Sequence, residues 1–159
     1  MIYIGIDPGV SGGIAMLNDD AQDYRTIKMP TTERDILDAF APWFTGGKPS
    51  AMAVLERVSS SPQMGVVSAF TFGRGVGGLR MALTAARIPF DEVTPQRWQQ
   101  AMGCMSRGDK NITKRRAQAL FPSWPSITHA IADALLIAEY CRRLNKGLLY
   151  SSAETKKRR

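Results

Sequence analysis

Three acidic side chains of this 159-residue chain stand where an ionised carboxylate is costly to bury. Asp7 ends the apolar run IYIGI, Glu56 ends the apolar run AMAVL, and Asp133 lies inside the apolar segment AIADALLIA. A buried carboxylate is unfavourable unless a cation or strong hydrogen-bond donors compensate its charge. Carboxylate oxygens are the ligands that Mg²⁺ and Mn²⁺ prefer, and two such ions can activate water for phosphodiester hydrolysis. The three acids therefore indicate a hydrolytic metal site.

Each acid also has a structural interpretation. Asp7 could cap the glycine-rich turn that follows it, Glu56 could form an ion pair, and Asp133 could be a capped core residue. His129 precedes Asp133 by four residues and would share its helix face. A neutral imidazole at His129 could bind metal or accept a proton from water, or it could be hydrogen bonded in the core. The structural interpretation requires that all three acids are structural at the same time. We therefore favour the metal site.

The hydrophobic pattern predicts the elements that would bring these residues together. Short apolar runs predict strands over about 2–6, 13–17, 24–29, 51–55 and 89–93. In a mixed sheet the first and fourth strands would be parallel neighbours, with Asp7 and Glu56 side by side at their carboxyl ends. Helical spacing predicts helices over about 33–44, 63–88, 95–102, 112–121 and 127–145, capped in part by Thr31 or Thr32, Thr94 and Ser126. The last helix would carry Asp133 across the sheet edge.

The predicted helix over 63–88 is unusually rich in glycine. Each glycine weakens a helix by about 1 kcal/mol, so another interaction should compensate. Small residues allow a second backbone to approach closely, either from a partner subunit or at a tight crossing within the chain. Both interpretations stay open for the glycines at 73, 75, 77 and 78.

Charge is distributed unevenly along the chain. The formal net charge is +7, yet residues 1–56 carry −4 and the remainder carries +11. An acidic end next to a strongly basic remainder favours a metal site beside a nucleic-acid-binding surface. For each basic residue a solvated surface charge is the alternative, and we favour that alternative for Arg116. The candidates for phosphate contact are Arg74, Arg80, Arg107, Lys110, Lys114 and Arg115.

Length and composition indicate a single domain, expected over 1–150, followed by a disordered basic tail at 151–159. No apolar run approaches the ~20 residues that cross a bilayer, and the first residues lack a signal-peptide pattern, so no membrane partner is expected. Cys104 and Cys141 show neither ligand-like spacing nor a disulfide framework. A reducing cytoplasm is therefore the expected location.

The segments IGIDPG (4–9), VLER (54–57) and HAIADALLIAEY (129–140) resemble the motifs of the RuvC-type Holliday junction resolvases, of the ribonuclease H-like superfamily. The compact form resembles the branch encoded by bacteriophages. The resemblance covers nearly the whole chain in order. It implies an α/β fold with a mixed five-stranded ribonuclease H-like sheet flanked by helices. It also implies that Asp7, Glu56 and Asp133 bind two Mg²⁺ ions per subunit, with Mn²⁺ able to substitute and no organic cofactor.

The same resemblance implies an activity. It is that of a crossover junction endodeoxyribonuclease of DNA recombination and repair, located in the host cytoplasm if the chain is phage-encoded. Such an enzyme works as a homodimer that nicks opposing strands of a four-way DNA junction and leaves 5′-phosphate and 3′-hydroxyl ends. The helix over 63–88 would make the dimer contact, and the Ser106–Lys114 region would contact DNA.

This chain departs from the family pattern at two places. His129 stands where many members have a fourth acid, although some relatives also have histidine there. Val58 and Ser59 occupy the positions nearest to an aromatic that stacks at the junction centre in several relatives. Two alternatives remain: another ribonuclease H-like nuclease acting on branched DNA or an RNA/DNA hybrid, and a non-catalytic junction-binding protein. A phosphotransferase of the actin and sugar-kinase type would need two such domains.

Overall fold

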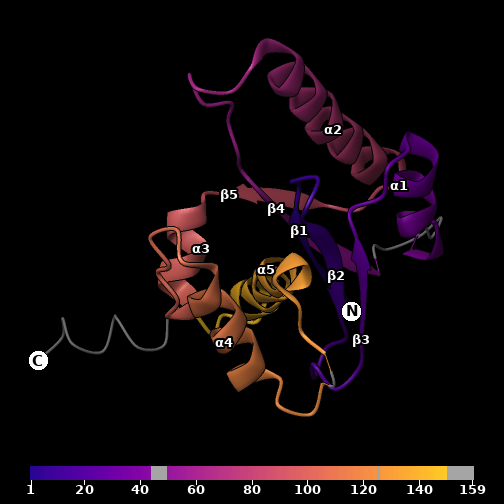
Figure 1. The fold of residues 1–159 in the computed structure, drawn as a ribbon. Helices are drawn as coiled ribbons and strands as arrows, with labels where there is room; N and C mark the ends of the chain where they lie inside the picture. The colour runs from indigo at the N-terminus through magenta and orange to yellow at the C-terminus, as the bar shows by residue number, and fades with distance from the viewer. Residues whose placement is uncertain (44–49, 125, 150–159) are drawn as a thin grey trace, which may run out of the picture.

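Five strands form one mixed sheet, and helices cover both of its faces (Figure 1). The computed structural model describes residues 1–43, 50–124 and 126–149, so Phe44 and the predicted tail at 151–159 lie outside the described residues. The strands are β1 (Ile2–Asp7), β2 (Gly13–Leu17), β3 (Tyr24–Lys28), β4 (Ala51–Glu56) and β5 (Phe90–Val93). The helices are α1 (Glu33–Phe40), the 3-10 turn η1 (Ala41–Trp43), α2 (Val66–Ala85), α3 (Pro95–Met102), α4 (Lys110–Leu120) and α5 (His129–Asn145).

The strand order is β3-β2-β1-β4-β5. β1, β2 and β3 form an antiparallel meander, whereas β1, β4 and β5 are parallel to one another. This arrangement confirms the predicted mixed five-stranded sheet and the predicted pairing of the first and fourth strands. The carboxyl ends of β1 and β4 therefore meet at one edge of the sheet.

The apolar residues divide into two cores, one on each side of the sheet. α1 and α2 cover the core that contains Ile4, Ile6 and Phe40. α3, α4 and α5 cover the other, which contains Trp98 and Leu135. Because the central strands are buried on both faces, their sequences are continuous apolar runs rather than alternating ones.

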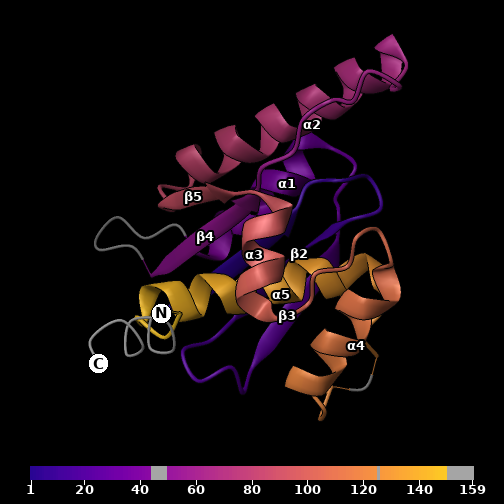
Figure 2. The same ribbon diagram turned by 90° about the vertical axis from the view of Figure 1, so that its left-hand side faces the viewer.

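Gly5 lets α5 pack directly against the backbone of β1. A Cβ atom built at Gly5 would overlap backbone atoms of Ala134, Ile137 and Ala138 in α5. Figure 2 shows α5 crossing the sheet. The position of α5, and of Asp133 within it, is thus fixed by contact between two backbones.

Helix α2 differs from its prediction in both extent and packing. It begins at Val66 rather than near 63, and it extends beyond the sheet (Figure 2). A Cβ atom at Gly73, Gly75 or Gly77 would meet nothing within 4 Å. A tight crossing within the chain is therefore the wrong explanation for these three glycines.

Capping side chains account for three of the five α-helix starts among the described residues. Thr32 and Thr94 accept hydrogen bonds from backbone N–H groups of α1 and α3, as predicted. The prediction for Ser126 is wrong, because Thr128 is the residue that precedes α5. Helix α4 begins two residues before its predicted start, since the Asp109 side chain accepts a hydrogen bond from the backbone of Asn111. Within the described ranges, no helix is long and apolar enough to cross a membrane.

Candidate active site

Asp7 and Glu56 end two neighbouring parallel strands. The register pairs Ile6 with Leu55, so the next residue on each strand is an acid. The turn after β1 closes tightly around Asp7: the backbone N–H of Gly9 lies 3.3 Å from Asp7 Oδ1, and a Cβ atom at Gly12 would stand 2.6 Å from Asp7 Cγ. A glycine is therefore required at position 12 for the chain to turn beside this carboxylate.

Asp133 reaches the same edge from the second turn of α5. Its charge acts on both Asp7 and Glu56, and the charge of Asp7 also acts on Glu56. Asp133 Oδ1 is buried and has no hydrogen-bond partner among the residues that the structure describes. Three carboxylates from three separate elements are thus within electrostatic range of one another, and one of them has an oxygen without a partner.

Burial and mutual repulsion make the charged form of Glu56 unfavourable. The pKa of Glu56 is raised to about 7, and burial is the largest cause. The negative charges of Asp7 and Asp133 contribute to this rise, while a hydrogen bond from the Trp98 indole opposes it. A carboxyl group in this environment binds a proton readily, or a cation in its place.

The pKa values of Asp7 and Asp133 are also raised. Burial raises the pKa of Asp7; the N–H of Gly9 and the charge of Lys110 oppose the rise, while the charge of Asp133 adds to it. Burial also raises the pKa of Asp133, and the Thr113 side chain and the charge of Lys110 oppose it. Lys110 therefore lies close enough to influence two of the three carboxylates.

The three carboxylates are suitable ligands for a hard divalent cation, although they do not converge on a single metal position. Within the described ranges, no three His, Cys, Asp or Glu side chains are grouped tightly enough to hold one metal ion alone. The three carboxylates supply only oxygen donors, and the buried Asp133 Oδ1 lacks any other partner. Mg²⁺ usually keeps several water ligands and takes only one or two carboxylates together with substrate phosphate. An open set of carboxylates is therefore compatible with Mg²⁺.

His129 is the first residue of α5 and is exposed. Its Nε2 atom lies 3.2 Å from Oδ1 of Asn111 in α4, and its charge acts on Asp133. The alternative of a histidine buried in the core is wrong. The side chain is instead exposed to solvent, within electrostatic range of Asp133.

The basic candidates fall into two groups. Lys110 begins α4 beside the acids, Arg107 and Arg115 are exposed near that end, and Lys114 is half-buried. The second group lies on α2, where Arg80 pairs with Glu92 at 2.9 Å and Arg74 lies 3.8 Å from Glu33. Of these basic residues, Lys110 is the one whose charge acts on the carboxylates of Asp7 and Asp133.

Arg116 does not have the role that we favoured for it. Its side chain is half-buried, and Nε donates a 2.7 Å hydrogen bond to the backbone carbonyl of Met102. It therefore links α4 to the end of α3, and the prediction of a solvated surface charge is wrong.

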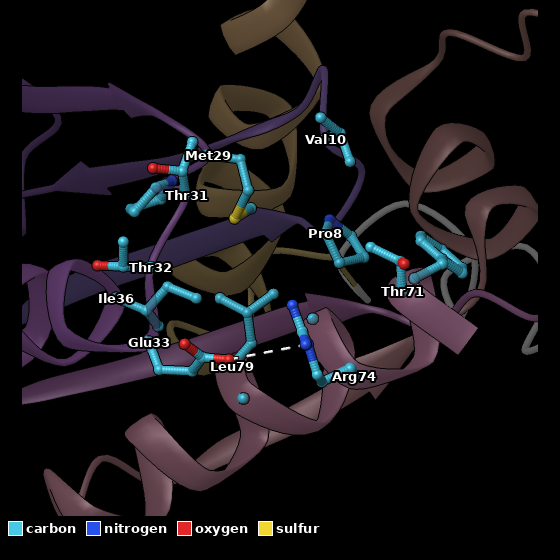
Figure 3. Close-up of a pocket in the computed structure, with 14 residues that line it drawn as sticks. Pro8, Val10, Met29, Thr31, Thr32, Glu33, Ile36, Thr71, Arg74 and Leu79 are labelled. Carbon is cyan, nitrogen blue, oxygen red and sulfur yellow. Dashed lines mark ion pairs between the residues drawn. The ribbon is translucent and has the colours of Figure 1, made fainter. Parts of the chain in front are cut away.

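A separate hollow lies between the β1–β2 turn, α1 and α2 (Figure 3). Pro8 and Val10 of the turn line it together with the segment before α1, and the Arg74–Glu33 ion pair lies among its lining residues. None of the three acids lines this hollow. We therefore place the candidate active site at the carboxylates and not here.

Sequence reasoning missed three residues that contact Glu56, Asp133 and His129. Trp98 donates to Glu56, Asn111 contacts His129, and Thr113 lies against Asp133. Trp98 lies within the predicted helix over 95–102, whose spacing gave it no role in the site. The one available signal was its indole N–H, which needs an acceptor when the ring is buried.

The raised pKa of Glu56 predicts how stability depends on pH in the metal-free protein. The pKa is about 7 in the folded protein against 4.5 for an unperturbed group. Protonated Glu56 therefore stabilises the fold fully below about pH 4.5, and this stabilisation is lost as pH rises through 7. We expect Glu56→Gln to raise the free energy of unfolding at pH 8 by roughly 2 kcal/mol, allowing for residual solvent exposure. Urea unfolding of both proteins at pH 5 and pH 8, with EDTA present, measures the difference, and equal pH profiles would contradict the prediction.

Comparison with known proteins places this geometry in a structural class. No family model matches the chain, and no curated protein matches its sequence. Among solved structures, it is similar to RuvC of Thermus thermophilus, with a TM-score of 0.65, 18% identity, and coverage of 93% of this chain and 98% of that one. It is also similar to T. thermophilus RuvC in complex with a Holliday junction substrate, with a TM-score of 0.62, 18% identity, and coverage of 93% and 97%.

The chain therefore has a ribonuclease H-like α/β fold, with a mixed five-stranded sheet between two layers of helices. Within that class, its fold is of the RuvC type, as the sequence motifs predicted.

Proposed function

We propose that this chain is a metal-dependent endonuclease that resolves four-way DNA junctions by paired nicking. The observation that carries the proposal is the meeting of Asp7, Glu56 and Asp133 at one sheet edge. Support also comes from the fold, since a RuvC of similar structure has been solved with a Holliday junction substrate. The same arrangement favours a nuclease hydrolase over a non-catalytic junction-binding protein.

The three carboxylates would hold Mg²⁺, two ions per subunit, and Mn²⁺ would substitute. When bound, such ions lower the pKa of water and neutralise charge on the phosphate. The chain's own residues position the substrate. Asp133 Oδ1 offers a ligand without a competing partner. His129, exposed beside Asp133, would serve as a further ligand or accept a proton from the attacking water.

The start of α4 would bind the DNA backbone next to the acids. Lys110 lies within electrostatic range of Asp7 and Asp133, and the exposed Arg107 and Arg115 lie near the same helix end. Cations at this place would hold a phosphate over the carboxylates. Arg74 and Arg80 would extend the contact along α2 once DNA competes for their acidic partners.

Cleavage of an immobile four-way junction tests the proposal. With strands labelled one at a time, we expect Mg²⁺-dependent nicks at symmetric positions in two opposing strands, with 5′-phosphate and 3′-hydroxyl ends. EDTA should abolish the nicks and Mn²⁺ should restore them. Preferential cutting of a flap or an RNA/DNA hybrid would instead identify a different ribonuclease H-like nuclease. Tight junction binding without cleavage in either metal would identify a non-catalytic junction-binding protein.

Helix α2 supports a homodimer as part of this function. Its residues at positions 66, 70, 73, 77 and 81 share one face, and the two largest side chains among them are exposed, Phe70 by 72% and Met81 by 65%. Gly73 and Gly77 lie between them and leave room for a second helix. A two-fold dimer would present two identical sites, which matches the need to nick two strands of a junction.

Phe70→Glu tests the dimer. Because Phe70 is exposed, the substitution should leave the monomer fold intact, while two buried carboxylates would oppose the interface. We expect the wild-type chain to sediment as a dimer at micromolar concentration and Phe70→Glu as a monomer. Gln96→Glu adds the same charge on the exposed surface of α3 and should remain dimeric. A monomeric wild-type protein, with and without junction DNA, would contradict the proposal.

A further inference from the structure

A buried tryptophan holds one oxygen of the Glu56 carboxylate. Trp98 Nε1 donates a 2.7 Å hydrogen bond to Glu56 Oε1. The Trp98 side chain is fully buried in the core between the sheet and α5. Since the indole is packed on all sides, its N–H has a fixed direction, and that direction points at the carboxylate.

The pairing of β4 with β5 determines the positions of both Glu56 and Trp98. β5 pairs with β4 so that Val93 lies opposite Glu56. α3 begins immediately after β5, capped by Thr94, and the backbone N–H of Trp98 lies 3.3 Å from the Thr94 carbonyl in the first helical turn. Trp98 is thus one helical turn beyond the strand that is paired with Glu56. Few torsions separate the two side chains, so their relative position is well determined.

The hydrogen bond from Trp98 gives the two oxygens of the Glu56 carboxylate different roles. In the described part of the chain, Trp98 is the single hydrogen-bond partner of the Glu56 carboxylate, and it engages Oε1. Oε2 is left for other ligands, on a carboxylate that lies within electrostatic range of Asp7 and Asp133. A carboxylate without this donor would rotate among several rotamers, most of which would not present Oε2 in a constant direction.

We propose that Trp98 is a positioning residue that orients the Glu56 carboxylate for metal binding. The inference rests on the proposed function, because it assumes that Glu56 is a metal ligand. Partners that orient a metal ligand typically change metal affinity by about 10- to 100-fold when they are removed. Loss of the indole N–H should therefore weaken metal binding even when the ring volume is largely kept.

The first experiment measures Mn²⁺ binding calorimetrically, without DNA, for the wild type and for Trp98→Phe. We expect the dissociation constant to rise about 10- to 100-fold in Trp98→Phe. Trp43→Phe is the matched control, because Trp43 Nε1 is buried and has no partner among the described residues, so its removal should leave the constant unchanged. Cleavage by Trp98→Phe should need correspondingly more Mg²⁺ for half-maximal rate, yet approach the wild-type rate at saturating Mg²⁺.

A second variant separates the effect of losing the indole N–H from the effect of losing packing. Replacing the tryptophan at position 98 with benzothienylalanine keeps the ring size and removes only the N–H. It should show the same loss of Mn²⁺ affinity with little change in melting temperature. Wild-type affinity in this variant would overturn the inference while leaving the proposed function intact. If the wild-type chain itself neither binds Mn²⁺ nor cuts junctions, both the inference and the proposed function are wrong.

Discussion

Asp133→Asn, Asp7→Asn and Glu56→Gln should each reduce junction cleavage by about 10³-fold or more, because bound metal supplies several kcal/mol of transition-state stabilisation and each 1.4 kcal/mol is a factor of ten. The substitutions keep the size of each side chain and remove its charge. Junction binding without metal should persist, since it depends on the basic start of α4. Removing a carboxylate should strengthen that binding slightly, because one repulsive charge beside the phosphates is lost.

Single-turnover cleavage and gel-shift binding of the same preparations measure the two effects. Asp91→Asn is the matched control, because Asp91 is an exposed carboxylate on β5. This variant should cleave the junction at the wild-type rate. A near wild-type rate for any one of the three variants in Mg²⁺ would remove that residue from the ligand set. A parallel loss of folding would show up as a lower melting temperature and is not expected.

Gly5→Ala should destabilise the fold strongly, although it adds only one methyl group. The new Cβ would overlap backbone atoms of α5, and a backbone cannot rotate away as a side chain can. We expect a loss on the order of 3 kcal/mol or more, and a fall in melting temperature of roughly 10 °C.

Gly75→Ala is the control for Gly5→Ala. A Cβ at position 75 of α2 would meet nothing within 4 Å, and alanine is a better helix former than glycine. The free energy of unfolding should stay constant or rise by about 0.5–1 kcal/mol. Equal effects of the two substitutions in urea unfolding would contradict the direct packing of α5 on β1.

The sequence was sufficient to predict the sheet and its central strand pair. Continuous apolar runs of five or six residues that end in Asp7 and Glu56 indicate strands buried on both faces. Two parallel strands of this kind bring their carboxyl ends together, so the meeting of these two acids follows from local pattern and simple topology. The starts of α1 and α3 were also predictable, because Thr32 and Thr94 cap them through contacts within three residues.

Other features depend on contacts that sequence spacing does not reveal. Trp98 is fully buried, and the spacing of residues in the predicted helix over 95–102 contains no information on where its indole N–H points. His129 was ambiguous between the core and the site, because its exposure depends on where α5 begins relative to α4. The early start of α4 was missed because Asp109 and Lys110 were assigned to a polar loop.

The candidate site is assembled from both ends of the chain, since β1 supplies Asp7 and α5 supplies Asp133. During synthesis the amino-terminal elements leave the ribosome first. A growing chain that lacks α5 has two of the three carboxylates and an uncovered face of β1 and β2. The proposed nuclease activity would therefore begin only after the last helix has docked, and a chain still on the ribosome would be unable to cut DNA.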